Sequence, residues 1–262
     1  MANLHAELAA LERRLPLHSL TVDSQRWEWL DTGGSGPCIV MLPGSAADAY
    51  MFVRPILELG EHHRIVSVSP PALWQPEVLA DGLAALFAHL ALPPALVAGS
   101  SFGAWWGPFF AQRHPRHVQA LLVGNGFVDA GDLAGNPMFD RAAIEGAAPQ
   151  ALHDQMRSRI EAAPDSDLRD LQRFMIARKP PASLHAHFLA VVRARSCPLL
   201  ALDPRRLLVL DCEDDPVIPP AGRANVRRHF TAGRQRTLAS GGHYAHLLNW
   251  PDYREELLGL LG

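Results

Sequence analysis

The stretch Ala95-Leu-Val-Ala-Gly-Ser-Ser-Phe-Gly-Ala-Trp-Trp-Gly107 decides how this chain folds. Its first residues form a short apolar run typical of a buried strand, and the residues after Gly103 suit a helix. The five residues between them follow the pattern G-x-S-x-G, which places a serine at the apex of a sharp strand-to-helix turn. Gly99 and Gly103 supply the small residues that this turn needs, because the helix doubles back against the strand. Ser101 is therefore a candidate nucleophile.

The position of the helix strengthens this interpretation. Its unpaired amides and the positive end of its dipole face any negative charge that forms at Ser101. The same five residues would also suit a glycine-rich turn that only packs a helix on a sheet. The other catalytic groups, which must follow in a fixed chain order, decide between these readings.

The pattern around this turn predicts an α/β fold. Strand-like apolar runs at 38–42, 64–69 and 118–123 alternate with helical patterns at 51–59 and from Pro76 onward. Such alternation favours a doubly wound, mostly parallel sheet. An N-terminal helix over 2–14 and a hairpin over 20–30 precede it.

The alternation stops after residue 126. Helical patterns fill 149–162, 166–178 and 183–195 without a convincing strand, and we expect 127–197 to form an inserted helical cap. The strand pattern resumes at 206–211 and again at 236–239, and a last helix follows over 251–261. The core would then consist of 1–126 and 198–262.

Composition excludes several classes of function. The chain has 262 residues and a net charge of -3. This charge is small, so it does not indicate binding to nucleic acid or to a membrane surface. It has no apolar run near the roughly 20 residues that span a bilayer and no signal peptide within 1–15. Cys38, Cys197 and Cys212 suit buried thiols in a reducing compartment, so we expect a cytoplasmic protein. Lys179 is the only lysine, which we interpret as a compositional habit.

Two later segments complete a catalytic set. A serine nucleophile needs a base, and the base needs an orienting acid. Glu213-Asp-Asp-Pro216 follows one late strand, and Ser240-Gly-Gly-His243 follows the last. The order Ser, Asp, His is the one that this type of turn requires, and each group follows a strand end, where sites form in parallel sheets.

These motifs resemble the α/β-hydrolase fold superfamily over nearly the whole chain. Finer details resemble its maspardin-like branch. They are Leu42-Pro-Gly44, Pro70-Pro-Ala-Leu-Trp74, Asp81-Gly82 and Gly124-Asn-Gly-Phe-Val-Asp129.

The resemblance implies roles for particular residues. Ser101 would be the nucleophile, His243 the general base and Asp215 the acid that orients it. The backbone amides of Ser45 and Phe102 would form the oxyanion hole.

Some alternatives stay open at this point. Asp129 is an alternative position for the acid that orients the histidine. Asp214 and Glu213 are neighbours of Asp215 that could be mistaken for it. Pro43 stands where the superfamily usually has a histidine, and this difference concerns the shape of the loop.

Further candidates lie outside the catalytic set. Tyr50 and Trp74 lie on loops at the active edge and are predicted to bind substrate. His246 is expected to pack locally, and the pairs His62-His63 and His185/His187 lack a second ligand cluster. We therefore expect no metal and no cofactor.

The sequence thus predicts a serine hydrolase, carboxylesterase-like, with a small, partly apolar acyl substrate. Thioesters, lactones, amides and carbon-carbon bonds are not excluded. The alternative is a non-catalytic binding module on the same fold. Neither nucleic acid nor a membrane span is expected, and the oligomeric state is not predicted.

Overall fold

The structure is a computed structural model that describes residues 4–262. Eight strands of this part form one sheet in the order β1-β2-β4-β3-β5-β6-β7-β8. The strand β2 pairs antiparallel with both β1 and β4, and the other neighbouring strands pair parallel. The strands are β1 (His18–Val22), β2 (Gln25–Asp31), β3 (Cys38–Leu42), β4 (Arg64–Ser69), β5 (Ala95–Ser100), β6 (Val118–Gly124), β7 (Leu207–Cys212) and β8 (Arg234–Leu238). This topology confirms the predicted mostly parallel α/β sheet.

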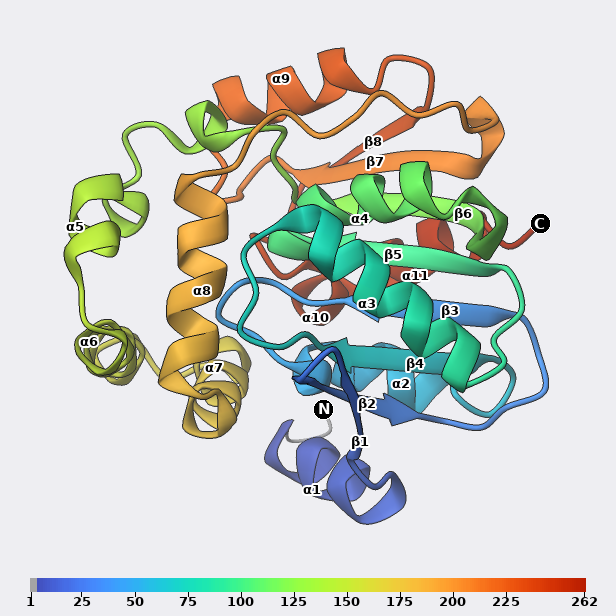
Figure 1. Cartoon of the computed structure of the whole chain (residues 1–262), viewed down its shortest axis with the longest axis horizontal. Helices are drawn as coiled ribbons and strands as arrows, with labels where there is room; N and C mark the ends of the chain where they lie inside the picture. The colour runs from blue at the N-terminus through green and yellow to red at the C-terminus, as the bar shows by residue number, and fades with distance from the viewer. Residues whose placement is uncertain (1–3) are drawn as a thin grey trace.

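Helices cover both faces of the sheet (Figure 1). They are α1 (Leu4–Arg14), α2 (Val53–Leu59), α3 (Pro76–His89), α4 (Phe102–Arg113), α5 (Arg141–Gly146), α6 (Pro149–Glu161), α7 (Asp167–Arg178), α8 (Pro181–Val192), α9 (Pro220–His229), α10 (Ala245–Leu248) and α11 (Trp250–Leu258). None of the helices in the described part is both long and apolar enough to cross a bilayer.

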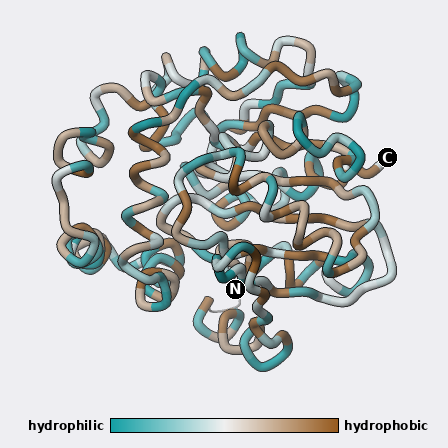
Figure 2. Tube along the Cα trace, in the orientation of Figure 1, coloured by the Kyte–Doolittle hydropathy of each residue, from teal (hydrophilic) through white to brown (hydrophobic). Residues whose placement is uncertain are grey.

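The central strands are apolar because they are buried on both faces. In β3, Val40 and Leu42 enter the core beneath α3, α4 and α9, whereas Ile39 and Met41 enter the core beneath α1, α2 and α11. Figure 2 shows brown along the central strands and both teal and brown along the outer helices. The sheet is therefore held between two apolar layers.

Helices α5–α8 lie between β6 and β7 in the chain and beside the sheet in Figure 1. They enclose a third apolar cluster of their own, which includes Ile144, Leu184 and Phe188. The helix α5 was not predicted, and α8 begins at Pro181 rather than at residue 183 because proline suits the first turn of a helix. The cap boundaries at 127 and 197 stay predictions.

Candidate active site

Ser101 lies at the turn between β5 and α4 in a strained backbone conformation, with φ 54° and ψ -114°. A Cβ built on Gly99 would lie 2.4 Å from the carbonyl oxygen of Gly103, and one on Gly103 would lie 2.2 Å from that of Leu42. No side chain fits in these spaces. The two glycines therefore allow the helix to return against its own strand, and the serine projects from the turn.

The hydroxyl of Ser101 opens into a cavity of about 100 Å³. His243 and the loop residues Gly44 and Ser45 line the same cavity. Its other side comes from the segment between β6 and β7, with Met138, Phe139, Met156, Arg159 and Gln172. The inserted helices thus roof the serine.

His243 is bound to a buried carboxylate. Its Nδ1 lies 2.9 Å from Oδ2 and 3.1 Å from Oδ1 of Asp215, so this nitrogen donates and leaves Nε2 as the acceptor. The backbone amides of Val217 and Ile218 donate to Asp215 Oδ1 at 2.7 and 3.1 Å. The carboxylate therefore holds one ring orientation of His243.

The pKa of Asp215 is below its usual value. Burial opposes its ionisation and would raise the pKa, but the charge and hydrogen bond of His243 act against burial. Donors from Val217 and Asn125 add to this, and together they lower the pKa. Asp215 is consequently ionised at neutral pH.

Ser101 and His243 line one cavity without a hydrogen bond between their side chains. Catalytic hydrogen bonds in structures without substrate are often long and tighten when substrate binds. The expected contact between Asp215 and His243 is present, whereas the contact with Ser101 stays a prediction.

The other acidic candidates have different tasks. Asp129 Oδ1 accepts from the amide of Gly131 at 2.9 Å, and Oδ2 accepts from the hydroxyl of Ser196. Asp214 accepts from the amides of Gly241 and Gly242 just before the histidine. The structure places only Asp215 of these acids within hydrogen-bond distance of the ring.

The amides of Ser45 and Phe102 lie on the two segments that flank Ser101. A Cβ on Gly44 would come within 3.6 Å of the Ser101 Cβ, so this loop passes directly beside the serine. Neither the Ser45 nor the Phe102 amide donates to a backbone carbonyl of the described residues. Both are free to bind an oxygen of a ligand.

A buried network from α7 and α8 supports this loop. Lys179 Nζ donates to the carbonyl oxygen of Ala47 at 2.6 Å and to Nδ1 of His187 at 3.1 Å. The other ring nitrogen of His187 donates to Pro71 O at 2.8 Å, and the ring stacks on Phe102 at 4.8 Å between centroids. Burial lowers the pKa of His187 well below its usual value, so the ring is neutral.

The same burial acts on the lysine. It lowers the pKa of Lys179 to about 8, opposed by the nearby carboxylate of Asp48. Burial raises the pKa of Asp48 to about 6, opposed first by the Tyr50 amide and then by Lys179. Sequence reasoning missed this network and also Asn125, for which an asparagine between two glycines at a strand end was the available signal.

Tyr50 and Trp74 do not reach the cavity of Ser101. Tyr50 packs on Phe174 beneath the guanidinium of Arg178, and it lines a separate hollow of about 620 Å³. Trp74 is 38% exposed and contacts Arg193. Neither side chain lines the cavity of the serine, so their predicted role in binding substrate has no support from this cavity.

The large hollow is lined by a different set of residues from the cavity of Ser101. Asp48 and Lys179 contribute to its wall, and neither Ser101 nor His243 reaches it. The smaller cavity contains the chemically competent groups, and we therefore take it as the candidate site. His246 is buried against Phe52, as local packing predicts.

The sequence matches no family model and no curated protein at a significant level. Among solved structures, the chain is similar to a hydrolase from Pseudomonas aeruginosa with a TM-score of 0.74 and 19% identity, covering 94% of this chain and 98% of that one. It is also similar to an enol-lactonase from Burkholderia xenovorans with a TM-score of 0.73 and 16% identity, covering 93% of this chain and 99% of that one. A third similar structure is a thermophilic esterase from Thermogutta terrifontis, with a TM-score of 0.72 and 19% identity, covering 94% of this chain and 97% of that one.

These likenesses extend over whole chains and concern the fold. The eight-stranded, mostly parallel sheet with helices on both faces agrees with them. The chain therefore has the α/β-hydrolase fold.

Proposed function

We propose that the protein is a serine hydrolase that cleaves a carboxylic ester or a related acyl bond. Ser101 is the nucleophile, His243 the general base and Asp215 the acid that orients the histidine. The hydrogen-bonded pair of Asp215 and His243, opening into the cavity of Ser101, is the observation that carries this proposal.

The reaction follows from these positions. His243 Nε2 takes the proton from the Ser101 hydroxyl while the oxygen attacks the substrate carbonyl. The amides of Ser45 and Phe102 bind the oxyanion, and His243 then gives the proton to the leaving alcohol. Water, deprotonated by His243, attacks the acyl-enzyme, and the proton returns to Ser101 as the acid is released.

The walls of the cavity indicate the substrate. Methionine and phenylalanine side chains suit a small, partly apolar acyl group, and methionine adapts to irregular shapes. The similar structures include an esterase and a lactonase, so an ester and its cyclic form are the first substrates to test. A thioester, an amide and a carbon-carbon bond use the same catalytic groups.

A fluorophosphonate probe tests the assignment of the nucleophile. We expect the wild-type protein to gain the mass of the probe on Ser101 and the Ser101→Ala variant to gain none. Ser100→Ala is the matched control, because it removes the neighbouring hydroxyl and should still be labelled. His243→Ala should slow the labelling by ~10³-fold or more. Peptide mapping that finds the label elsewhere contradicts the proposal.

The maspardin-like motifs favour a second candidate, a binding module without turnover. Its partner surface would be the inserted helices or α1. A folded protein that neither reacts with the probe nor hydrolyses p-nitrophenyl esters supports this alternative. Circular dichroism on the same sample establishes that the protein is folded.

A further inference from the structure

We propose that the substrate carries a carboxylate at the end remote from the scissile bond and that Arg159 binds it. This inference rests on the proposed hydrolase function and adds a substrate class to it. The substrates would be half-esters of dicarboxylic acids, with an apolar chain between the ester and the free acid.

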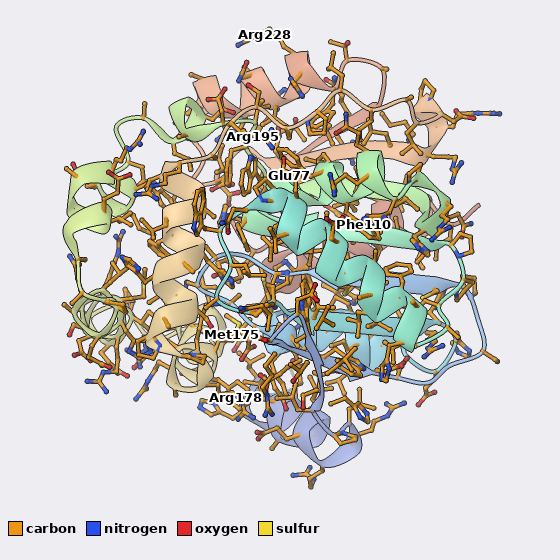
Figure 3. All side chains as sticks on the ribbon, viewed as in Figure 1. Glu77, Phe110, Met175, Arg178, Arg195 and Arg228 are labelled. Carbon is orange, nitrogen blue, oxygen red and sulfur yellow. The ribbon has the colours of Figure 1, made fainter. Side chains whose placement is uncertain are left out.

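The first observation is that Arg159 lacks a partner. In residues 4–262 only Arg13, Arg116 and Arg159 among the arginines have neither an ion pair, a hydrogen bond nor an aromatic contact. Arg195, labelled in Figure 3, is typical of the others, since it pairs with Glu77. Arg13 and Arg116 line none of the cavities described above.

The second observation is the position of Arg159. This residue lies near the end of α6 and lines both the cavity of Ser101 and an adjoining hollow of about 90 Å³. The two spaces also share Met138 and Met156. The adjoining hollow continues over the buried apolar side chains Ile144, Leu152 and Phe188. Mostly apolar side chains therefore line the space that Ser101 shares with Arg159, whose side chain is also exposed to solvent.

The chemistry of this space defines the ligand. A guanidinium presents a planar set of donors that matches a carboxylate in a two-point contact. Asp140 also lines the adjoining hollow, but its Oδ1 accepts from the amide of Ala143 and caps α5. A carboxylate from the substrate would thus be the first to pair with Arg159, and the methionines would contact the methylene chain.

Paired substrates test the inference. Mono-p-nitrophenyl suberate and p-nitrophenyl octanoate share an eight-carbon acyl chain and differ by the terminal carboxylate. We expect the wild-type protein to have the higher kcat/KM for the suberate ester. In Arg159→Gln the suberate-to-octanoate ratio of kcat/KM should fall by about tenfold to a hundredfold, mainly through KM. Arg159→Glu should favour octanoate outright.

Arg157→Gln is the matched control. Arg157 lies on the same helix and pairs with Asp154 at the surface, so its loss should leave the ratio unchanged. A ratio that Arg159→Gln does not alter overturns the inference, and it leaves the hydrolase function intact if octanoate hydrolysis still requires Ser101. Hydrolysis of both esters by Ser101→Ala, or of neither by the wild-type protein, overturns both.

Discussion

Asn125 joins two parts of the candidate site through a single side-chain nitrogen. Its Nδ2 donates to Asp215 Oδ2 at 2.9 Å and to the carbonyl oxygen of Gly242 at 3.1 Å. The residue has φ 45°, a conformation that asparagine tolerates better than most residues. Asn125 therefore fixes the acid relative to the loop that leads into His243.

An aspartate in this place should disturb the acid. In Asn125→Asp two carboxylates would lie about as close as the present hydrogen bond, and like charges at this distance do not both ionise. The acid limb of the pH profile of kcat/KM should move to higher pH by about one unit or more. Asn125→Gly loses the amide, suits the positive φ and adds no charge. An equal shift in both variants would show that the charge is not the cause.

At the scale of elements, the network of Lys179 and His187 ties the inserted helices to the loop of Ser45. Lys179 follows the end of α7, and His187 lies on α8. Both side chains are buried, and the contact partners Ala47 and Pro71 belong to loops at the sheet edge. The loop that offers the Ser45 amide thus depends on the helices that roof it.

Lys179→Met should therefore impair both turnover and folding. We expect kcat to fall about tenfold with a smaller change in KM, because the Ala47 carbonyl loses the donor that positions the loop. The buried carboxylate of Asp48 loses one of the positive charges that favour its ionised form, which should lower the free energy of unfolding by about 1 to 3 kcal/mol. Denaturant titration and ester kinetics measure the two effects.

The double variant Lys179→Met/Asp48→Asn separates these effects. Removing both charges should restore most of the stability, since no buried charge is then left alone. It should not restore kcat, because Ala47 still lacks its donor. Recovery of both the free energy of unfolding and kcat would show that the network has no role in positioning the loop.

The elements show what could be predicted from the sequence. The strand at 38–42 could be predicted because all of its residues are apolar. The structure buries all of them. The helix α5 was not, since Arg141–Gly146 is short, ends in glycine and has one buried residue. The motif and its chain order predicted Ser101, Asp215 and His243 as a catalytic set, and the structure shows the contact between the last two.

The rest of the site depends on contacts between distant parts of the chain. The hydrogen bond between Lys179 and Ala47 joins residues 132 positions apart, and no local sequence pattern predicts it. Tyr50 and Trp74 were placed on loops at the expected edge, but a loop position does not tell where its side chains point. These positions follow from packing against Phe174 and Arg193 and could not be predicted from local sequence.

At the scale of the whole molecule, buried neutral histidines link folding to pH. Burial lowers the pKa of His246 to about 3, and His187 behaves similarly. An unfolded histidine titrates near 6.5, so between pH 6.5 and 3 the unfolded chain binds more protons than the folded one. The stability that these groups contribute is fully present above pH 6.5 and is lost as the pH falls.

We expect the free energy of unfolding to decline below pH 6.5 by about 1.4 kcal/mol per pH unit for each such histidine. His246→Leu should reduce this slope by about that amount between pH 6 and 4. His62→Gln, which changes an exposed histidine, should not alter it. Denaturant titrations at several pH values provide the slopes, and an unchanged slope in His246→Leu contradicts the assignment.

The position of the single lysine has a practical consequence. Every amine-directed reagent that attacks a side chain has one target in this protein, and that target lies in the wall of the 620 Å³ hollow, bonded to Ala47 and His187. Only 6% of Lys179 is exposed, so a reagent must approach its amine through this hollow. The rate of acylation, followed by mass spectrometry, would therefore measure how readily a small molecule enters the hollow.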